Sequence, residues 1–159
     1  MTAHATLSLV VLILAAAALL YAALTDLTQY KIRNEVILVL VALYLIHALI
    51  SGRLASVPWN VGFALALLIV LLYFFSRNLL GGGDVKLLAV ALLWAGPDCA
   101  LPFAVLLLFF AMLHTGAVKL GWARAQQLDD DARARIPFAP SVAAALIGTF
   151  MLGYLPPAA

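Results

Sequence analysis

The chain has 159 residues, of which 67% are hydrophobic and 10% charged, and its formal net charge is +2. A water-soluble domain of this size cannot bury so much apolar surface, so the composition predicts an integral membrane protein. The small positive charge is not gathered into a long basic patch, which excludes a nucleic-acid-binding class. A single cysteine, Cys99, excludes an internal disulfide and a structural zinc site built from cysteine pairs.

Six apolar stretches predict an all-α, polytopic protein with six transmembrane helices and a single integral-membrane domain over residues 1–159. A spanning helix needs roughly 20 residues. The stretches cover about residues 5–25, 36–50, 57–75, 85–95, 100–118 and 138–154. Residues 1–4 carry no Lys or Arg and a long apolar run follows them, which favours a retained first helix over a cleaved signal peptide.

The fourth apolar stretch is short, and Gly96-Pro97-Asp98 ends it. It reaches across the membrane only if the Gly-rich segment before it also lies at membrane depth. Non-helical backbone is tolerated there only where protein buries it or where it lines a wet cavity. The short helix and the glycines together predict a polar pocket beside Asp84.

The distribution of Lys and Arg predicts the orientation. Cytoplasmic loops are enriched in these residues, so the side that carries most of them is expected to be cytoplasmic, with both termini outside. Tryptophans near the ends of the stretches, Trp59, Trp94 and Trp122, are expected to be interfacial anchors. With alternating spans, the basic side holds Lys31, Arg33, Arg77, Lys86, Lys119, Arg124, Arg133 and Arg135, and the other side holds only Arg53.

Two acidic residues fall on the same predicted side and at the same depth. Asp26 ends the first stretch, and Asp84 closes the run Gly81-Gly82-Gly83-Asp84 before the fourth. A charge at bilayer depth is costly and marks a functional site. Two carboxylates in a restricted space share a proton, so one can act as general base on water and the other as general acid. Glycines beside Asp84 would let a substrate backbone approach closely.

Simpler roles exist for each feature. Gly81 to Gly83 can form a loop with Asp84 as the N-cap of the next helix, and Asp26 can be a lone interfacial charge. The matched depth of the two residues favours a functional pair. A rival class is a proton-coupled transporter or an assembly subunit without enzymatic activity. Transport needs polar groups that continue across the membrane, and the centres of these stretches have almost none.

Three segments resemble motifs of the type IV prepilin peptidases, which are membrane aspartyl proteases. Gly81-Gly82-Gly83-Asp84-Val85-Lys86 resembles their Gly-x-Gly-Asp-x-Lys signature. Asp26 followed by Tyr30-Lys31-Ile32-Arg33-Asn34 resembles a first motif, an Asp some residues before Ile-Pro-Asn. Ile136-Pro137-Phe138-Ala139-Pro140 resembles a third, Ile-Pro-Phe-x-Pro. Arg33 stands where the family usually has Pro, so the turn after Asp26 is expected to differ.

The resemblance implies roles for individual residues. Asp26 and Asp84 correspond to the catalytic pair. Lys86 would position the substrate or tune Asp84, although snorkelling to the surface is an equal alternative. Asn34 would lie near the first Asp or cap the second helix, and capping is the simpler role. The residues assigned to substrate binding are Gly81, Gly83, Lys86, Asn34 and Pro137.

The resemblance also implies an activity: an aspartic-type endopeptidase of the bacterial inner membrane that removes basic leaders from prepilin or pseudopilin precursors on the cytoplasmic side. The compact chain resembles the tight-adherence (Flp pilus) type, and archaeal preflagellin peptidases are a related alternative. It lacks the cysteine-rich insertion of bifunctional members, so we expect neither methyltransferase activity nor a metal, and no cofactor. The expected partners are pilin-like precursors and membrane lipid. Two further candidates are His114, which could also be a packing residue, and the polar stretch 121–135, for leader recognition.

Overall fold

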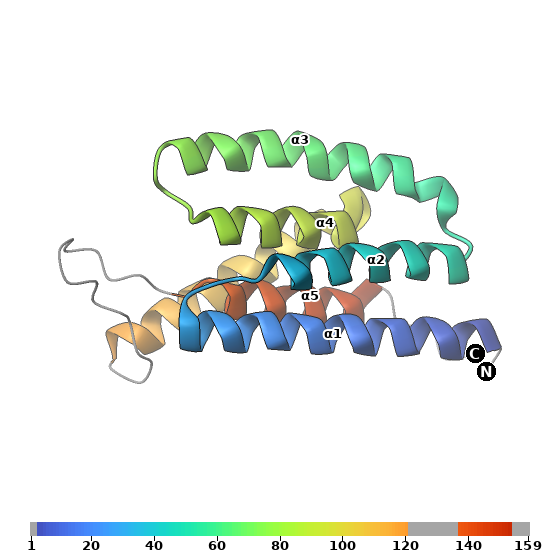
Figure 1. Ribbon diagram of the computed structural model, residues 1–159, viewed down its shortest axis with the longest axis horizontal. Helices are drawn as coiled ribbons and strands as arrows, with labels where there is room; N and C mark the ends of the chain where they lie inside the picture. Colours follow the sequence, from blue (N-terminus) through green and yellow to red (C-terminus); the bar gives the residue numbers. More distant parts are fainter. Residues whose placement is uncertain (1–2, 121–136, 154–159) are drawn as a thin grey trace.

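The computed structural model describes residues 3–120 and 137–153 and folds them almost entirely into helices. Figure 1 shows the helices lying side by side along one direction. This confirms the all-α class. The elements in chain order are α1 (Ala3–Gln29), α2 (Asn34–Ile50), the short 3₁₀ helix η1 (Leu54–Ser56), α3 (Val57–Ser76), α4 (Gly82–Lys119) and α5 (Ala139–Gly153).

The longest helix, α4, reverses direction at Gly96, the only residue inside it with non-helical backbone angles (φ 60°, ψ −179°). Figure 1 shows the first part of α4 running beside α3 and the second part running back. In the second part Leu106 faces Gly148 and Cys99 faces Gly153, so this part is antiparallel to α5. The break expected at Gly96-Pro97-Asp98 is confirmed, and it is confined to Gly96.

Within residues 3–120 and 137–153, the six expected stretches correspond to six helical segments that alternate in direction, with α4 supplying two of them. Alternation has a simple consequence for the ends of the bundle. Helix α1 begins and α5 ends at one end, whereas α1 ends and α4 and α5 begin at the other (Figure 1). The chain thus brings Asp26, Asp84 and the start of α5 to one end of the molecule.

Small side chains allow the helices to approach closely in the centre of the bundle. Helix α1 buries Ala15, Leu19 and Ala22, and α5 buries a matching row that includes Ala143 and Leu146. Without a hydrophobic driving force in lipid, helices associate through such close packing. The first part of α4 lies in the same core, where it buries Leu87, Ala91 and Trp94.

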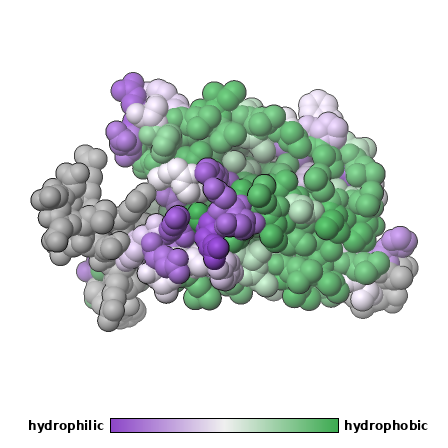
Figure 2. Space-filling view, in the orientation of Figure 1, coloured by the Kyte–Doolittle hydropathy of each residue, from purple (hydrophilic) through white to green (hydrophobic). Residues whose placement is uncertain are grey.

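The exterior is strongly apolar. Large side chains such as Ile13, Ile69 and Trp59 are more than half exposed, with Trp59 at 77%. Figure 2 shows a broad apolar surface with hydrophilic residues gathered toward the ends. Among the described residues three helices are long and apolar enough to cross a membrane, His4–Gln29, Leu54–Ser76 and Gly82–Lys119, while α2 and α5 are apolar but shorter. The chain is therefore a membrane protein.

Two expectations are wrong. Trp94 is not an interfacial anchor: it is fully buried, and its indole N–H donates to the carbonyl oxygen of Leu40 at 3.0 Å. The Gly-rich segment is not an extended non-helical stretch, because α4 already begins at Gly82. Of the three glycines in this run, only Gly81 lies before the helix, and its backbone angles are extended. Trp122 lies outside the described residues.

Candidate active site

A cavity of about 130 Å³ lies at the end of the bundle where α1 ends and α4 begins. That volume is far above the roughly 10–15 Å³ needed to hold one water molecule. The two acidic residues, 58 positions apart in sequence, meet at this cavity as their predicted depth required. Its lining residues are Asp26, Tyr30, Lys31, Ile32, Gly83, Asp84, Pro137 and Phe138.

Asp26 comes from the last turn of α1 and is only 6% exposed. Its Oδ2 atom accepts a hydrogen bond of 2.9 Å from the backbone N–H of Ala139, the first residue of α5. The first N–H groups of a helix have no partner within the helix, and a carboxylate there is electrostatically favourable. The structure therefore does not support a lone interfacial charge at Asp26, because its carboxylate joins α1 to α5.

Asp84 lies in the first turn of α4, as its third residue. The N-cap is Gly81, so the alternative in which Asp84 caps the helix is wrong. The backbone N–H of Val85 donates to the carbonyl oxygen of Gly81 at 3.1 Å, which closes this first turn. Asp84 consequently stands on a regular helical turn, half-buried at the cavity wall, and not on a loose glycine loop.

The segment between α1 and α2 forms another wall of the cavity. Tyr30, the residue after α1, has a left-handed conformation (φ 50°), which is uncommon for a residue with a side chain. This turn places Ile32 against Gly83. A Cβ built on Gly83 would lie 3.3 Å from the Cβ of Ile32, closer than ordinary van der Waals contact. Gly83 therefore lacks a side chain because Ile32 occupies that space.

We expect the variant Gly83→Ala to cleave substrate about tenfold more slowly, because an added methyl displaces the Tyr30–Ile32 wall and small misplacements cost rate steeply. The nearest atom is the branched Cβ of Ile32, which cannot move without its backbone. Gly82→Ala is the matched control, since its Cβ would meet only the ring edge of Phe75 at 3.4 Å. Initial cleavage rates of the two variants measure the difference. Equal rates would contradict this role of Gly83.

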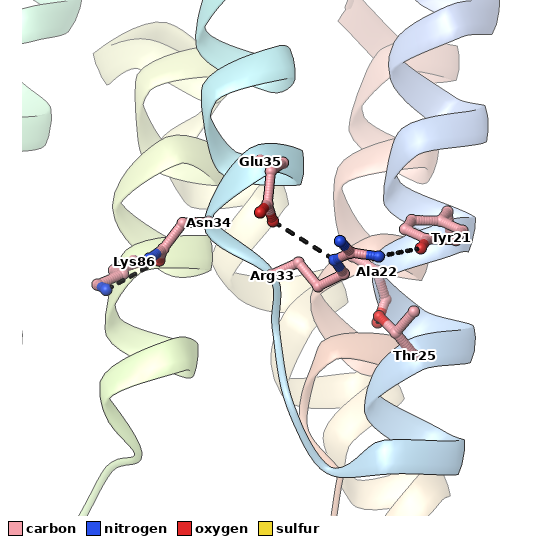
Figure 3. A network of polar contacts seen from close by, with 7 residues as sticks. All are labelled: Tyr21, Ala22, Thr25, Arg33, Asn34, Glu35 and Lys86. Carbon is pink, nitrogen blue, oxygen red and sulfur yellow. Dashed lines mark hydrogen bonds and ion pairs between the residues drawn. The ribbon is translucent and has the colours of Figure 1, made fainter.

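Outside the cavity, polar side chains tie the same segment to its neighbours. Lys86 Nζ donates to Asn34 Oδ1 at 3.0 Å, which joins α4 to the start of α2 (Figure 3). Arg33 lies between Tyr21, to whose hydroxyl it donates at 3.4 Å, and Glu35, with an ion pair of 3.4 Å. The Tyr21 hydrogen bond and then the Glu35 charge raise the pKa of Arg33, which stays cationic.

Asn34 is the first residue of α2, and the N-cap position is Arg33, which makes no side-chain capping hydrogen bond. The expectation that Asn34 caps α2 is wrong. Lys86 is exposed, as snorkelling requires, but its ammonium group has a specific partner. Neither residue is among those that line the cavity, and Gly81 is not among them either. Of the predicted substrate-binding residues, Gly83 and Pro137 line it.

If the Lys86–Asn34 contact supports the cavity, Lys86→Met and Asn34→Ala should each slow cleavage to a similar extent, and the double variant should be no slower than either alone. Residues that act through one shared contact are non-additive in this way. If Lys86 contacts substrate instead, Lys86→Met alone will be slow and Asn34→Ala will be close to wild type. Rates of the four proteins at matched membrane levels decide between these roles.

The sequence did not single out several residues of this site. Tyr30, Lys31, Ile32 and Phe138 line the cavity, although they were noted only as parts of motifs. Ala139 contributes through its backbone N–H, for which no side-chain pattern gives a signal. His114 lies in the second part of α4 and is not among the cavity residues. The polar stretch 121–135 lies outside the described residues.

A comparison with protein families matches residues 13–120 to the type IV leader peptidase family. The match spans more than half of the chain and includes both carboxylates. The chain belongs to the type IV leader peptidase family. No curated protein and no solved structure matches it. Membership of this family means that the helical membrane protein is a peptidase. Pro137 and Phe138 lie beyond the matched residues, so their place at the cavity comes from the structure alone.

Proposed function

We propose that this leader peptidase is an aspartic-type endopeptidase and that Asp26 and Asp84 are its catalytic pair. One observation carries the proposal: acidic side chains from α1 and α4 line one cavity of about 130 Å³ at the end of an otherwise apolar bundle. Among the described residues no group of three or more His, Cys, Asp or Glu gathers as a metal site would require. Asp26 and Asp84 are the acidic residues that line the cavity, and Tyr30 and Lys31 line it with them.

The proposed reaction is direct hydrolysis. One carboxylate takes a proton from a water molecule, whose oxygen attacks the scissile carbonyl carbon. The other, protonated carboxyl group donates its proton to the carbonyl oxygen. As the tetrahedral intermediate collapses, the C–N bond breaks. The carboxyl group that took the proton of water gives it to the leaving amine, and the other carboxylate takes a proton back from a hydroxyl of the intermediate. No covalent intermediate forms. For two interacting carboxylates the titration belongs to the pair, so the roles of base and acid need no fixed assignment.

The proposed substrate is a prepilin-like precursor with a basic leader and a hydrophobic helix that stays in the bilayer. Its extended segment would pass Gly83 and Pro137, which line the same cavity as the two carboxylates. Gly81, Lys86 and Asn34 would support that cavity from outside it. The leader would lie on the cavity side of the membrane and the apolar helix in the bilayer, which favours cleavage between the charged and the apolar parts of the substrate.

The proposed placement is a bacterial inner membrane crossed by all six helical segments, with both termini outside and the cavity at the cytoplasmic face. Eight of the nine Lys and Arg residues fall on the side of the cavity when spans alternate, which supports this orientation through the positive-inside rule. The compact chain without a cysteine-rich insertion supports processing of Flp-type prepilins without methylation. We propose that no metal or cofactor takes part.

The test is co-expression of the full chain with a tagged Flp-type prepilin. Loss of the leader is followed by a gel shift, and the new N-terminus is located by mass spectrometry. A product cut between the leader and the hydrophobic segment supports the proposal. An uncut precursor, together with uncut pseudopilin precursors in the same assay, would overturn it. Family membership disfavours the rival transporter or scaffold, which would leave every precursor intact.

A further inference from the structure

We propose that the backbone N–H of Ala139 is a positioning group of the active site, which holds the carboxylate of Asp26 in its reactive orientation. The inference rests on the proposed function and adds the start of α5 to the machinery. Three observations lead to it: a short hydrogen bond, its burial, and the local sequence around Ala139.

The hydrogen bond joins two buried groups from helices far apart in sequence. The N–H of Ala139 donates to Asp26 Oδ2 at 2.9 Å; Ala139 is fully buried and Asp26 is 6% exposed. A hydrogen bond between a buried donor and a carboxylate is stronger than one between neutral groups. It fixes one carboxylate oxygen on the α5 side, and we infer that the other is thereby turned toward Asp84 across the cavity.

The sequence at the start of α5 makes Ala139 the donor available for this task. Pro140 follows it and has no N–H group. The N–H of Ser141 already donates to the carbonyl oxygen of Phe138 at 3.1 Å. Of the first three residues of α5, Ala139 is thus the one whose N–H is directed to Asp26. Pro137 and Phe138, immediately before it, line the same cavity.

The variant Ala139→Pro suits the backbone at the start of α5, but it replaces the N–H by a ring methylene that also presses on Asp26 Oδ2, which lies 2.9 Å from the nitrogen. Proline is favoured at the first position of a helix, and Phe138 before it is not helical, as the residue before a proline should be. Ala139→Gly keeps the N–H and is the matched control. Loss of a group that orients a reactive side chain typically costs about 10- to 100-fold in activity. We expect this loss in kcat for Ala139→Pro, with an unchanged KM, and a clearly smaller loss for Ala139→Gly.

A second measurement needs no change at Ala139. Hydrogen–deuterium exchange of the peptide that contains the start of α5 is compared between Asp26→Asn and Asp26→Ala. Asn keeps an oxygen acceptor for the N–H and Ala does not, so exchange should be faster only in Asp26→Ala. Equal exchange in the two variants would overturn the proposal, even if Ala139→Pro fails to fold.

The kinetic outcomes separate this inference from the function on which it rests. If wild type cleaves the tagged prepilin and Ala139→Pro has wild-type kcat, the positioning role is wrong and the peptidase stands. If Ala139→Pro raises KM and leaves kcat unchanged, the start of α5 binds substrate and does not position Asp26. If wild type cleaves no precursor, the proposed function fails and the inference fails with it.

Discussion

Replacement of Asp26 or Asp84 by Asn is expected to abolish leader cleavage, with a loss of at least about 100-fold for each, because general acid–base catalysis contributes that much or more. Asn has the shape of Asp but cannot exchange a proton in this chemistry. At position 26 its amide oxygen can still accept the N–H of Ala139, so the contact between α1 and α5 survives. Cleavage rates at matched membrane levels measure the effect.

The controls separate chemistry from folding. Asp98→Asn alters a carboxylate just after the reversal of α4, at the end of the bundle away from the cavity, and should cleave as wild type does. Asp26→Ala should lose activity and also some thermal stability in detergent, since removal of a capping side chain typically costs about 1 kcal/mol. Cleavage that persists in both Asn variants would exclude the aspartic mechanism and leave family membership intact.

Hydropathy was sufficient to predict an all-helical membrane protein, because lipid requires long apolar helices. The expected stretch 57–75 corresponds to α3 (Val57–Ser76), and the stop at Gly96 to the reversal inside α4. The meeting of Asp26 and Asp84 followed from alternation of the segments alone, since each residue lies at the same end of the bundle. The lengths of the apolar stretches and their alternating directions can be read directly from a single sequence.

Side-chain partners were not predictable in the same way, because they depend on which helix faces meet. Trp94 lies near the end of its helical segment, where an anchor was expected, but that face of α4 turns inward, and Trp94 packs on Tyr44 and Phe150. Asn34 was expected to cap a helix and instead accepts from Lys86, 52 residues away. The hydrogen bond from Ala139 to Asp26 uses only a backbone N–H of α5, so the residue type at position 139 does not predict it.

The variant Gly96→Ala is expected to cause the largest loss of stability, because two costs coincide at this residue. Its backbone angles (φ 60°, ψ −179°) belong to a region that is almost restricted to glycine, and holding another residue there costs about 1–3 kcal/mol. A Cβ would also lie 2.6 Å from Oδ1 of the buried Asn60. Overpacking of a well-filled site typically costs about 1–3 kcal/mol more. Thermal unfolding in detergent measures the loss.

Gly62→Ala is the matched control, since Gly62 lies inside α3 and nothing stands within 4 Å of an added Cβ. Alanine should be neutral or stabilising there by about 0.5–1 kcal/mol. Adding Asn60→Ala to Gly96→Ala relieves the steric clash but not the backbone strain, so stability should return only in part. Full recovery would mean that Asn60 alone forbids a side chain at Gly96.

Gly96→Ala should lose cleavage as well as stability, because of the geometry of α4. The first part of α4 carries Asp84 to the cavity, and its second part packs on α5, whose start holds Asp26.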